Sequence, residues 1–143
     1  MSSMTSSANS TTLTSTVNVT AVNDAPTLTT TSTLAYTENG SATAINTALT
    51  VADPDNTTLT SATVSITGNG FASGQDVLGF TNVPATMSNI AGTYNASTGV
   101  LTLTSSGGAA TLAQWQTALR AVTYFNSSDN PNTSAQDGQL CRQ

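Results

Sequence analysis

Oxygen-bearing side chains gather in short stretches of the sequence that are typical of loops. Asp53-Pro54-Asp55-Asn56 places two carboxylates and an amide within four residues, and Pro54 stiffens the backbone between them. Hard cations such as Ca²⁺ prefer carboxylate, amide and carbonyl oxygens. The stretch is not an EF-hand, because the Gly and the distal Glu of that loop are missing at the required spacing. Calcium binding is therefore the first chemical hypothesis.

More acids and amides lie where the expected strands end. Asp and Asn also accept backbone hydrogen bonds in tight turns without any metal, so a turn role is the alternative for each of them. Asp76 stands at the start of an expected strand, and we interpret it as a turn acid. The candidate metal ligands are Asn23, Asp24, Glu38, Asp53, Asp55 and Asp129.

Residues for enzyme chemistry are largely missing from the sequence. The chain has no His and no Lys, which removes a Ser-His-Asp triad, a histidine zinc site, a Walker loop and a Schiff base. Its single cysteine, Cys141, can form neither an internal disulfide nor a thiolate cluster. We therefore predict no catalytic residues, no organic cofactor and no enzyme activity.

The composition favours an all-β extracellular domain. Hydrophobic residues make up 37% of the 143 residues, enough for a core, while charged residues make up only 6%. Thr is abundant, and its β-branched side chain suits a pleated sheet better than a helix. The net charge of −5, with two basic residues, offers no surface for nucleic acid or anionic lipid. No apolar run is long enough to span a membrane, and the N-terminus lacks the apolar core of a signal peptide.

The strands that must position the acidic loops show as short alternating or β-rich stretches. Residues 62–67 alternate most cleanly between polar and apolar side chains. Ala96-Ser97-Thr98-Gly99 has the composition of a hairpin turn. The expected strands cover residues 13–22, 28–36, 44–51, 62–67, 76–80, 93–95, 100–104 and 121–125.

One stretch has a helical period instead. Leu112, Trp115, Leu119 and Val122 fall on one face of a short helix, with Thr111 as its N-cap. This spacing favours a place in the core for Trp115 over a role in stacking on a sugar. Many short strands, one short helix and frequent Gly and Asn turns favour a Greek-key β-sandwich.

Six stretches of the sequence, taken in order, carry a family resemblance. They are VNVTAVNDAPTLT, YTENGSATAI, TVADPDNTTL, ASGQDVLGF, GTYNASTGVLTLT and WQTALRAVTYFNSSDNPN. Together they resemble the tandem cadherin-like (Ig-like) repeats of very large bacterial surface proteins and secreted adhesins, from about residue 12 to residue 134. The resemblance implies an Ig-like, cadherin-like Greek-key sandwich that lacks its closing strands.

The resemblance also implies how the chain is divided. In that family Asn-Asp-Ala-Pro is a junction, so residues 12–22 look like the last strand of a preceding repeat and residues 23–134 like most of the next one. Residues 1–11, rich in Ser, Thr and Asn, are expected to be disordered. Residues 135–143 are expected to be a non-native or frayed tail, since one set of codons for them, shifted by one base, encodes the family's Arg-Thr-Val-Ser-Phe strand. The alternative is that the tail is a genuine sequence that has diverged from the family.

For calcium, the resemblance implies a position between consecutive repeats. In cadherin-type modules an Asp-x-Asp loop, a Glu near the first strand and an Asn/Asp linker hold the ion. Asp53, Asp55, Glu38, Asn23 and Asp24 match these positions. The chain departs from the family in its shorter linker motif and in lacking a second acidic pair.

The resulting functional hypothesis is a structural and adhesive repeat module, extracellular or at a cell surface, whose partners are adjacent repeats. A carbohydrate-binding module, or an accessory module of an exported enzyme, is the alternative. An incomplete sandwich exposes a sheet edge, which predicts strand-mediated self-association. Residues 12–22 are expected to fill such a gap in a neighbouring chain, because Asn23 to Pro26 spans at most ~14 Å and cannot return them to their own domain.

Overall fold

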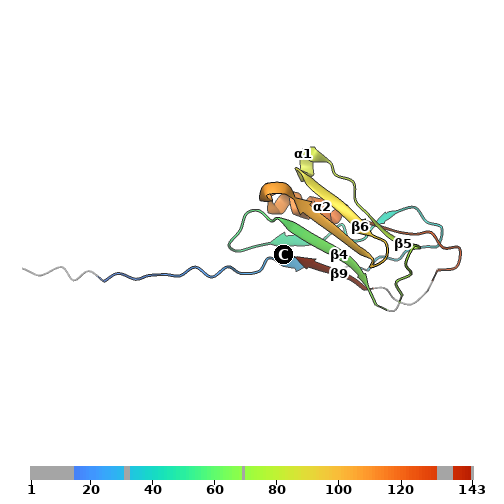
Figure 1. Ribbon diagram of the computed structural model, residues 1–143, viewed down its shortest axis with the longest axis horizontal. Helices are drawn as coiled ribbons and strands as arrows, with labels where there is room; N and C mark the ends of the chain where they lie inside the picture. Colours follow the sequence, from blue (N-terminus) through green and yellow to red (C-terminus); the bar gives the residue numbers. More distant parts are fainter. Residues whose placement is uncertain (1–14, 31–32, 69, 132–136, 143) are drawn as a thin grey trace, which may run out of the picture.

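The computed structural model describes residues 15–30, 33–68, 70–131 and 137–142 of the chain (Figure 1). The expectation of disorder for residues 1–11 lies outside the described residues. Within them the fold is all-β, with three antiparallel sheets and few helices. No helix in these ranges is long and apolar enough to cross a membrane.

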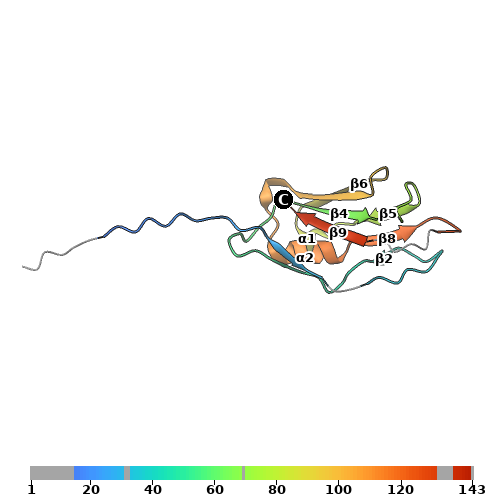
Figure 2. The ribbon, with the colours of Figure 1, turned by 90° about the horizontal axis from the view of Figure 1, so that it is seen from below.

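Three sheets and two helices surround one hydrophobic core. The largest sheet has the order β6 (Ile90–Asn95), β7 (Val100–Ser105), β4 (Ser61–Thr67) and β9 (Asp137–Arg142). The second sheet has the order β2 (Thr43–Ala44), β8 (Thr123–Asn126) and β5 (Asp76–Gly79). The third consists of β1 (Thr27–Thr29) paired with β3 (Thr50–Ala52). The helices are α1 (Pro84–Met87) and α2 (Leu112–Arg120), and a 3-10 turn covers Ser106–Gly108. α2 packs against α1 and β3, and Figure 2 shows it on the opposite side of the domain from β6.

The centre of the largest sheet follows the alternation in the sequence. In β4 the residues Ala62, Val64 and Ile66 are buried, while the residues between them are half-buried. β7 pairs with β4 in a register that sets Leu103 opposite Ala62 and Leu101 opposite Val64, so the same face of both strands enters the core. The prediction of strands at 62–67 and 100–104 is confirmed.

The predicted hairpin turn joins β6 to β7. The backbone N–H groups of Thr98 and Gly99 both donate to the carbonyl of Asn95. Gly99 has φ of +71°, a left-handed conformation that glycine adopts without strain. The ring of Phe71 packs so closely that a Cβ on Gly99 would meet it at 2.7 Å, which gives this position a second reason to be glycine.

The predicted helix forms where the period placed it. Thr111 is the N-cap of α2 and shares a capping box with Gln114, whose side chain accepts from the backbone N–H of Thr111. Trp115 is 0% exposed, and its indole N–H donates to the carbonyl of Leu59 at 2.9 Å. The prediction of a core position for Trp115 is confirmed, so this side chain is not available to stack on a sugar.

A second, shorter helix was not predicted. Pro84–Met87 forms α1, with Pro84 at its start and the buried side chain of Met87 at its end. A proline at the first helical position loses no hydrogen bond, because that N–H has no partner within the helix. A single turn is too short to show a helical period, which is why periodicity did not find α1.

Residues 15–22, where the sequence predicts a strand, are not paired with any sheet. Every residue from 15 to 22 is exposed, and the segment runs away from the domain as an extended trace (Figure 1). A strand is stable only with a partner, and none of the described strands supplies one. That this segment is the closing strand of a preceding repeat stays a prediction.

The C-terminal residues differ from the expected frayed tail. Residues Asp137–Arg142 form β9, which pairs with β4 so that Asp137 lies opposite Thr67 and Arg142 opposite Ala62. The outer edge of β4 would otherwise have unpaired backbone groups, and any chain of sufficient length that reaches this edge gains main-chain hydrogen bonds. The pairing does not test whether the sequence of the tail is native.

Candidate functional site

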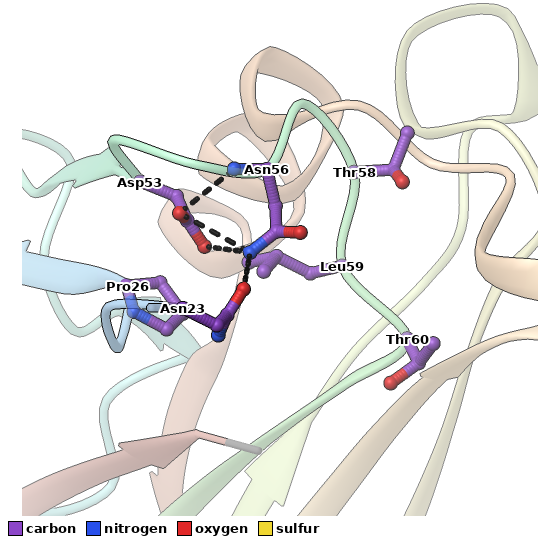
Figure 3. A pocket seen from close by; sticks show the side chains of 7 residues that line it. All are labelled: Asn23, Pro26, Asp53, Asn56, Thr58, Leu59 and Thr60. Atoms are coloured by element: carbon purple, nitrogen blue, oxygen red, sulfur yellow. Dashed lines mark hydrogen bonds between the residues drawn. The ribbon is translucent and has the colours of Figure 1, made fainter. Parts of the chain in front are cut away.

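The linker before β1 is fastened to the acidic loop after β3. The side-chain amide of Asn56 donates to Oδ1 of Asn23 at 2.8 Å (Figure 3). The backbone N–H of Asp24 donates to Oδ2 of Asp55 at 2.5 Å. These bonds join residues about thirty positions apart in the chain. We call the cluster of Asn23, Asp24, Asp53, Asp55 and Asn56 the linker clasp.

Asp53 organises the loop side of the linker clasp. Its Oδ1 accepts from the backbone N–H groups of Asp55 and Asn56, each at 2.9 Å. The amide of Asn56 also donates to both carboxylate oxygens, at 3.4 and 3.3 Å. These bonds are those of an Asx turn, so the turn role that we held as the alternative for Asp53 is present in the structure.

An open pocket lies between the linker and this loop. It is lined by Asn23, Pro26, Asp53, Asn56, Thr58, Leu59 and Thr60, and Figure 3 shows the polar side chains of Asn23, Asp53 and Asn56 turned toward one another. The end of the domain that holds this pocket also contains the start of β4, because Thr60 immediately precedes that strand. We call this end the Asp53 pole.

Glu38 and Asp129 lie at the opposite end of the domain. Glu38 is in a turn in which Gly40 N–H donates to the carbonyl of Thr37, and the hydroxyl of the neighbouring Tyr36 accepts from the backbone N–H of Asn126. Asp129 follows the end of β8 at Asn126. We call this end, where β8 ends and β5 begins, the Asp129 pole.

The six candidate ligands therefore fall into two groups. The linker clasp brings Asn23, Asp24, Asp53 and Asp55 together, whereas Glu38 and Asp129 are at the other pole. Within the described ranges, no three acidic, histidine or cysteine side chains lie close enough to hold a metal ion. A calcium site that uses all six residues cannot form within one domain, so it would need two domains that meet pole to pole.

The sequence interpretation of Asp76 as a turn acid missed a buried carboxylate. Asp76 is 0% exposed at the start of β5. Its Oδ1 accepts from the hydroxyl of Tyr124 at 2.5 Å and from the amide of Asn126 at 2.6 Å, and its Oδ2 accepts from the backbone N–H of Ala72 at 2.6 Å. One signal was available: Tyr124 is on the expected strand 121–125 and Asn126 directly follows it, so an extended backbone that continued by one residue would put both on one face.

Two further tyrosines, Tyr36 and Tyr94, lie next to this network. The rings of Tyr36 and Tyr124 meet edge to face, with centroids 5.0 Å apart at 88°. The hydroxyl of Tyr94 donates to the backbone carbonyl of Asp76 at 2.7 Å. Burial raises the pKa of the Tyr94 phenol above its usual 10.0, the negative charge of Asp76 raises it further, and a backbone hydrogen bond at Leu78 opposes the rise.

The raised pKa of Tyr94 predicts a loss of stability in alkali. The unfolded chain releases the Tyr94 proton near pH 10, whereas the folded chain keeps it to a higher pH. Above about pH 10 the unfolded state therefore holds fewer protons, and the free energy of unfolding falls as the pH rises. Urea unfolding at several pH values from 8 to 11 measures this slope. Tyr94→Phe should flatten it above pH 10, and equal slopes for both proteins would contradict the assignment.

Comparison with known proteins finds a match to part of the chain. Over 77 residues, 53% of this chain, the sequence is 46% identical to halomucin of Haloquadratum walsbyi. The chain spans about 1% of the length of halomucin. No family model matches the chain, and no solved structure gives a significant match.

Proposed function

We propose that this chain is a structural and adhesive repeat module of a large cell-surface or secreted protein. The observation that carries the proposal is the 46% identity to a segment that makes up only 1% of halomucin. A short domain that resembles a small part of a very long protein is what a module in an extended chain would be. Its work is mechanical, holding other parts of the protein away from the surface.

The fold supports a module of the cadherin-like, Ig-like Greek-key class. The described strands are all paired antiparallel, the sheets surround one core, and the linker joins the domain at one pole. A module of this kind connects to its neighbours end to end. Asn23 and Asp24, which the linker clasp fixes against the loop at Asp53, would then set the angle between neighbours.

Calcium between consecutive modules is the second part of the proposal. If one more strand after β9 returns the chain to the Asp129 pole, that pole of one module faces the Asp53 pole of the next in an end-to-end array. Glu38 and Asp129 of one module would then complete the oxygen ligands that Asp24, Asp53 and Asp55 of its neighbour begin. A bound Ca²⁺ would neutralise these carboxylates and stiffen the joint.

We propose no catalytic role. The chain has neither His nor Lys, and its single Trp is buried, so neither acid–base chemistry nor a sugar platform has an observation in its favour. An adhesive target is recognised by sites on a module rather than by its fold. The partners proposed here are therefore the adjacent modules of the same polypeptide.

The gene that surrounds this sequence tests the module proposal. The full reading frame is expected to encode further copies of the domain, joined through Asn-Asp-Ala-Pro. A reading frame with this domain as its one copy, beside an unrelated catalytic domain, would overturn the proposal. The accessory-module alternative would then replace it.

Calcium binding is tested in a protein of two consecutive modules. Millimolar Ca²⁺ is expected to raise the melting temperature by at least about 5 °C, since a ligand at 100 times its dissociation constant adds about 2.7 kcal/mol. Asp53→Ala should abolish the calcium-dependent shift, and Thr93→Ala, at an exposed position in the middle of β6, should keep it. Because Asp53 also forms the Asx turn, the comparison uses the shift and not the absolute melting temperature. No shift in the two-module protein would remove calcium and leave the module proposal intact.

A further inference from the structure

The segment 15–22 is an extended, unpaired stretch of chain with an apolar side. Val17, Val19 and Val22 are 79%, 86% and 76% exposed, and they are three of the four large hydrophobic residues that are exposed in the described part of the chain. Val17 and Val19 alternate with Asn18 and Thr20, so an extended backbone turns both valines to one side. The segment carries no charged residue, and charge is a common way to protect a strand from pairing with another chain.

The outer edge of β9 is where such a strand fits. β9 ends the largest sheet and pairs with β4 on one side alone within the described ranges. At the other end of that sheet, β6 lies close to β5, since the Tyr94 hydroxyl bonds the Asp76 carbonyl and a Cβ on Gly92 would meet Phe80 at 2.9 Å. β9 is therefore the more open edge.

The direction of β9 decides which copy supplies the strand. β9 runs from its pairing with Thr67 to its pairing with Ala62, that is, toward the Asp53 pole. Every described strand pair in this domain is antiparallel, so an added strand would run toward the Asp129 pole and would end there with Val22. The linker clasp, however, holds the next residue, Asn23, at the Asp53 pole of its own domain. The length of β9, about 20 Å at ~3.3 Å per residue, would separate Val22 from Asn23 if both belonged to the same domain. The added strand must therefore come from another copy of the chain.

We propose that residues 15–22 of one copy add as an antiparallel strand to β9 of a second copy of this chain. Val17 and Val19 then face the same side of the sheet as Val64 and Ile66 of β4, which extends the apolar face of the sheet. The backbone of the segment gains a ladder of hydrogen bonds along β9. This assembly does not depend on the proposed function.

The geometry makes the association head to tail. The donor domain lies beyond the Asp129 pole of the acceptor, with its own Asp53 pole nearest. The donor's β9 and the acceptor's segment 15–22 both remain free for further copies. A contact of this kind does not close on itself, so it produces chains of increasing length with concentration.

Light scattering after size-exclusion chromatography tests whether the segment is responsible. At high concentration, the average mass of the full chain is expected to be at least about twice that of Val17→Asp/Val19→Asp, because two charges on the apolar side cannot face a core. The matched control is Val83→Asp/Thr86→Asp, which adds the same charge at exposed positions outside the segment and should associate like the original chain. Equal masses for all three proteins would overturn the proposal.

Disulfide cross-linking tests the direction and the partner. Cys141 lies in β9 opposite Thr63 and is the single cysteine of the chain, so the unaltered protein can form disulfide dimers at most. In the antiparallel arrangement Asn18 lies near Cys141 and Val22 lies near Asp137, and a disulfide requires Cα atoms about 4.4–6.8 Å apart. Asn18→Cys should give a ladder of dimers, trimers and longer species on a non-reducing gel, at least about fivefold more than Val22→Cys. A cross-link within one chain, or a ladder as strong from Val22→Cys, would overturn the proposal.

Discussion

Replacing Asp76 with alanine is expected to lower the free energy of unfolding by at least about 3 kcal/mol. The carboxylate is fully buried and accepts hydrogen bonds from the Tyr124 hydroxyl, the Asn126 amide and the backbone N–H of Ala72. Its removal leaves one buried donor, on Asn126, and two half-buried donors, on Tyr124 and Ala72, without this acceptor, and each unsatisfied group costs about 1–3 kcal/mol. Because these donors come from two segments, β8 and the loop before β5, their loss loosens the Asp129 pole. Guanidinium unfolding measures the difference.

The matched control for Asp76 is an exposed acid at the same pole. Asp129→Ala is expected to change stability by less than about 0.5 kcal/mol, as surface substitutions usually do. Asp76→Asn keeps the shape of the side chain but sets an N–H₂ group against one of the donors, so its cost should fall between those of the two alanine variants. Equal costs for Asp76→Ala and Asp129→Ala would show that the buried network does not stabilise the fold.

Trp115→Ala is the second large effect, with an expected loss of about 3–5 kcal/mol. Trp115 is the largest fully buried side chain, and it connects α2 to the residues before β4 through its hydrogen bond to Leu59. Truncation to alanine removes the apolar contacts, leaves a cavity and deprives the Leu59 carbonyl of its donor. A loss of this size is a large part of the 5–15 kcal/mol that stabilises an ordinary domain.

Two further variants separate the parts of this effect. Trp115→Phe keeps much of the buried ring but removes the indole N–H and part of the ring volume, so it should cost less than Trp115→Ala and at least the cost of the unpaired Leu59 carbonyl, about 1–3 kcal/mol. Val83→Ala, at a valine that is 47% exposed, should cost less than about 0.5 kcal/mol. A Trp115→Ala protein as stable as Val83→Ala would mean that α2 does not depend on this side chain.

Local patterns in the sequence were sufficient for the parts of the fold that depend on neighbouring residues. The alternation at 62–67, the hairpin turn at 96–99 and the cap and period of α2 are all local, and the structure confirms them. Strand pairing between distant segments was not predictable in the same way. Residues 15–22 and 137–142 show this, since the first has a strand pattern and no partner, while the second, part of the tail expected to be non-native or frayed, pairs along β4.

The candidate site was predicted only in part, because residue types are local information and the position of a loop in the fold is not. Loop composition identified Asp53 and Asp55, and the junction pattern identified Asn23 and Asp24, which the structure joins in the linker clasp. Glu38 has a similar composition around it, but the path of the chain between β1 and β2 carries it to the other pole. Side-chain type can be read from one position, whereas the pole at which a loop lies depends on every strand before it.

The two ends of the described domain lie at the same pole, and this has a mechanical consequence. The linker joins the domain at the Asp53 pole, and β9 ends there too, where Arg142 lies opposite Ala62. Tension applied between these points would break the hydrogen bonds between β9 and β4 one at a time. One more traverse of the domain, antiparallel to β9, would move the outgoing chain to the opposite pole. The same tension would then act along the strands and load all the hydrogen bonds between neighbouring strands at once, in shear. A single added strand would therefore raise the force that is needed to unfold the domain.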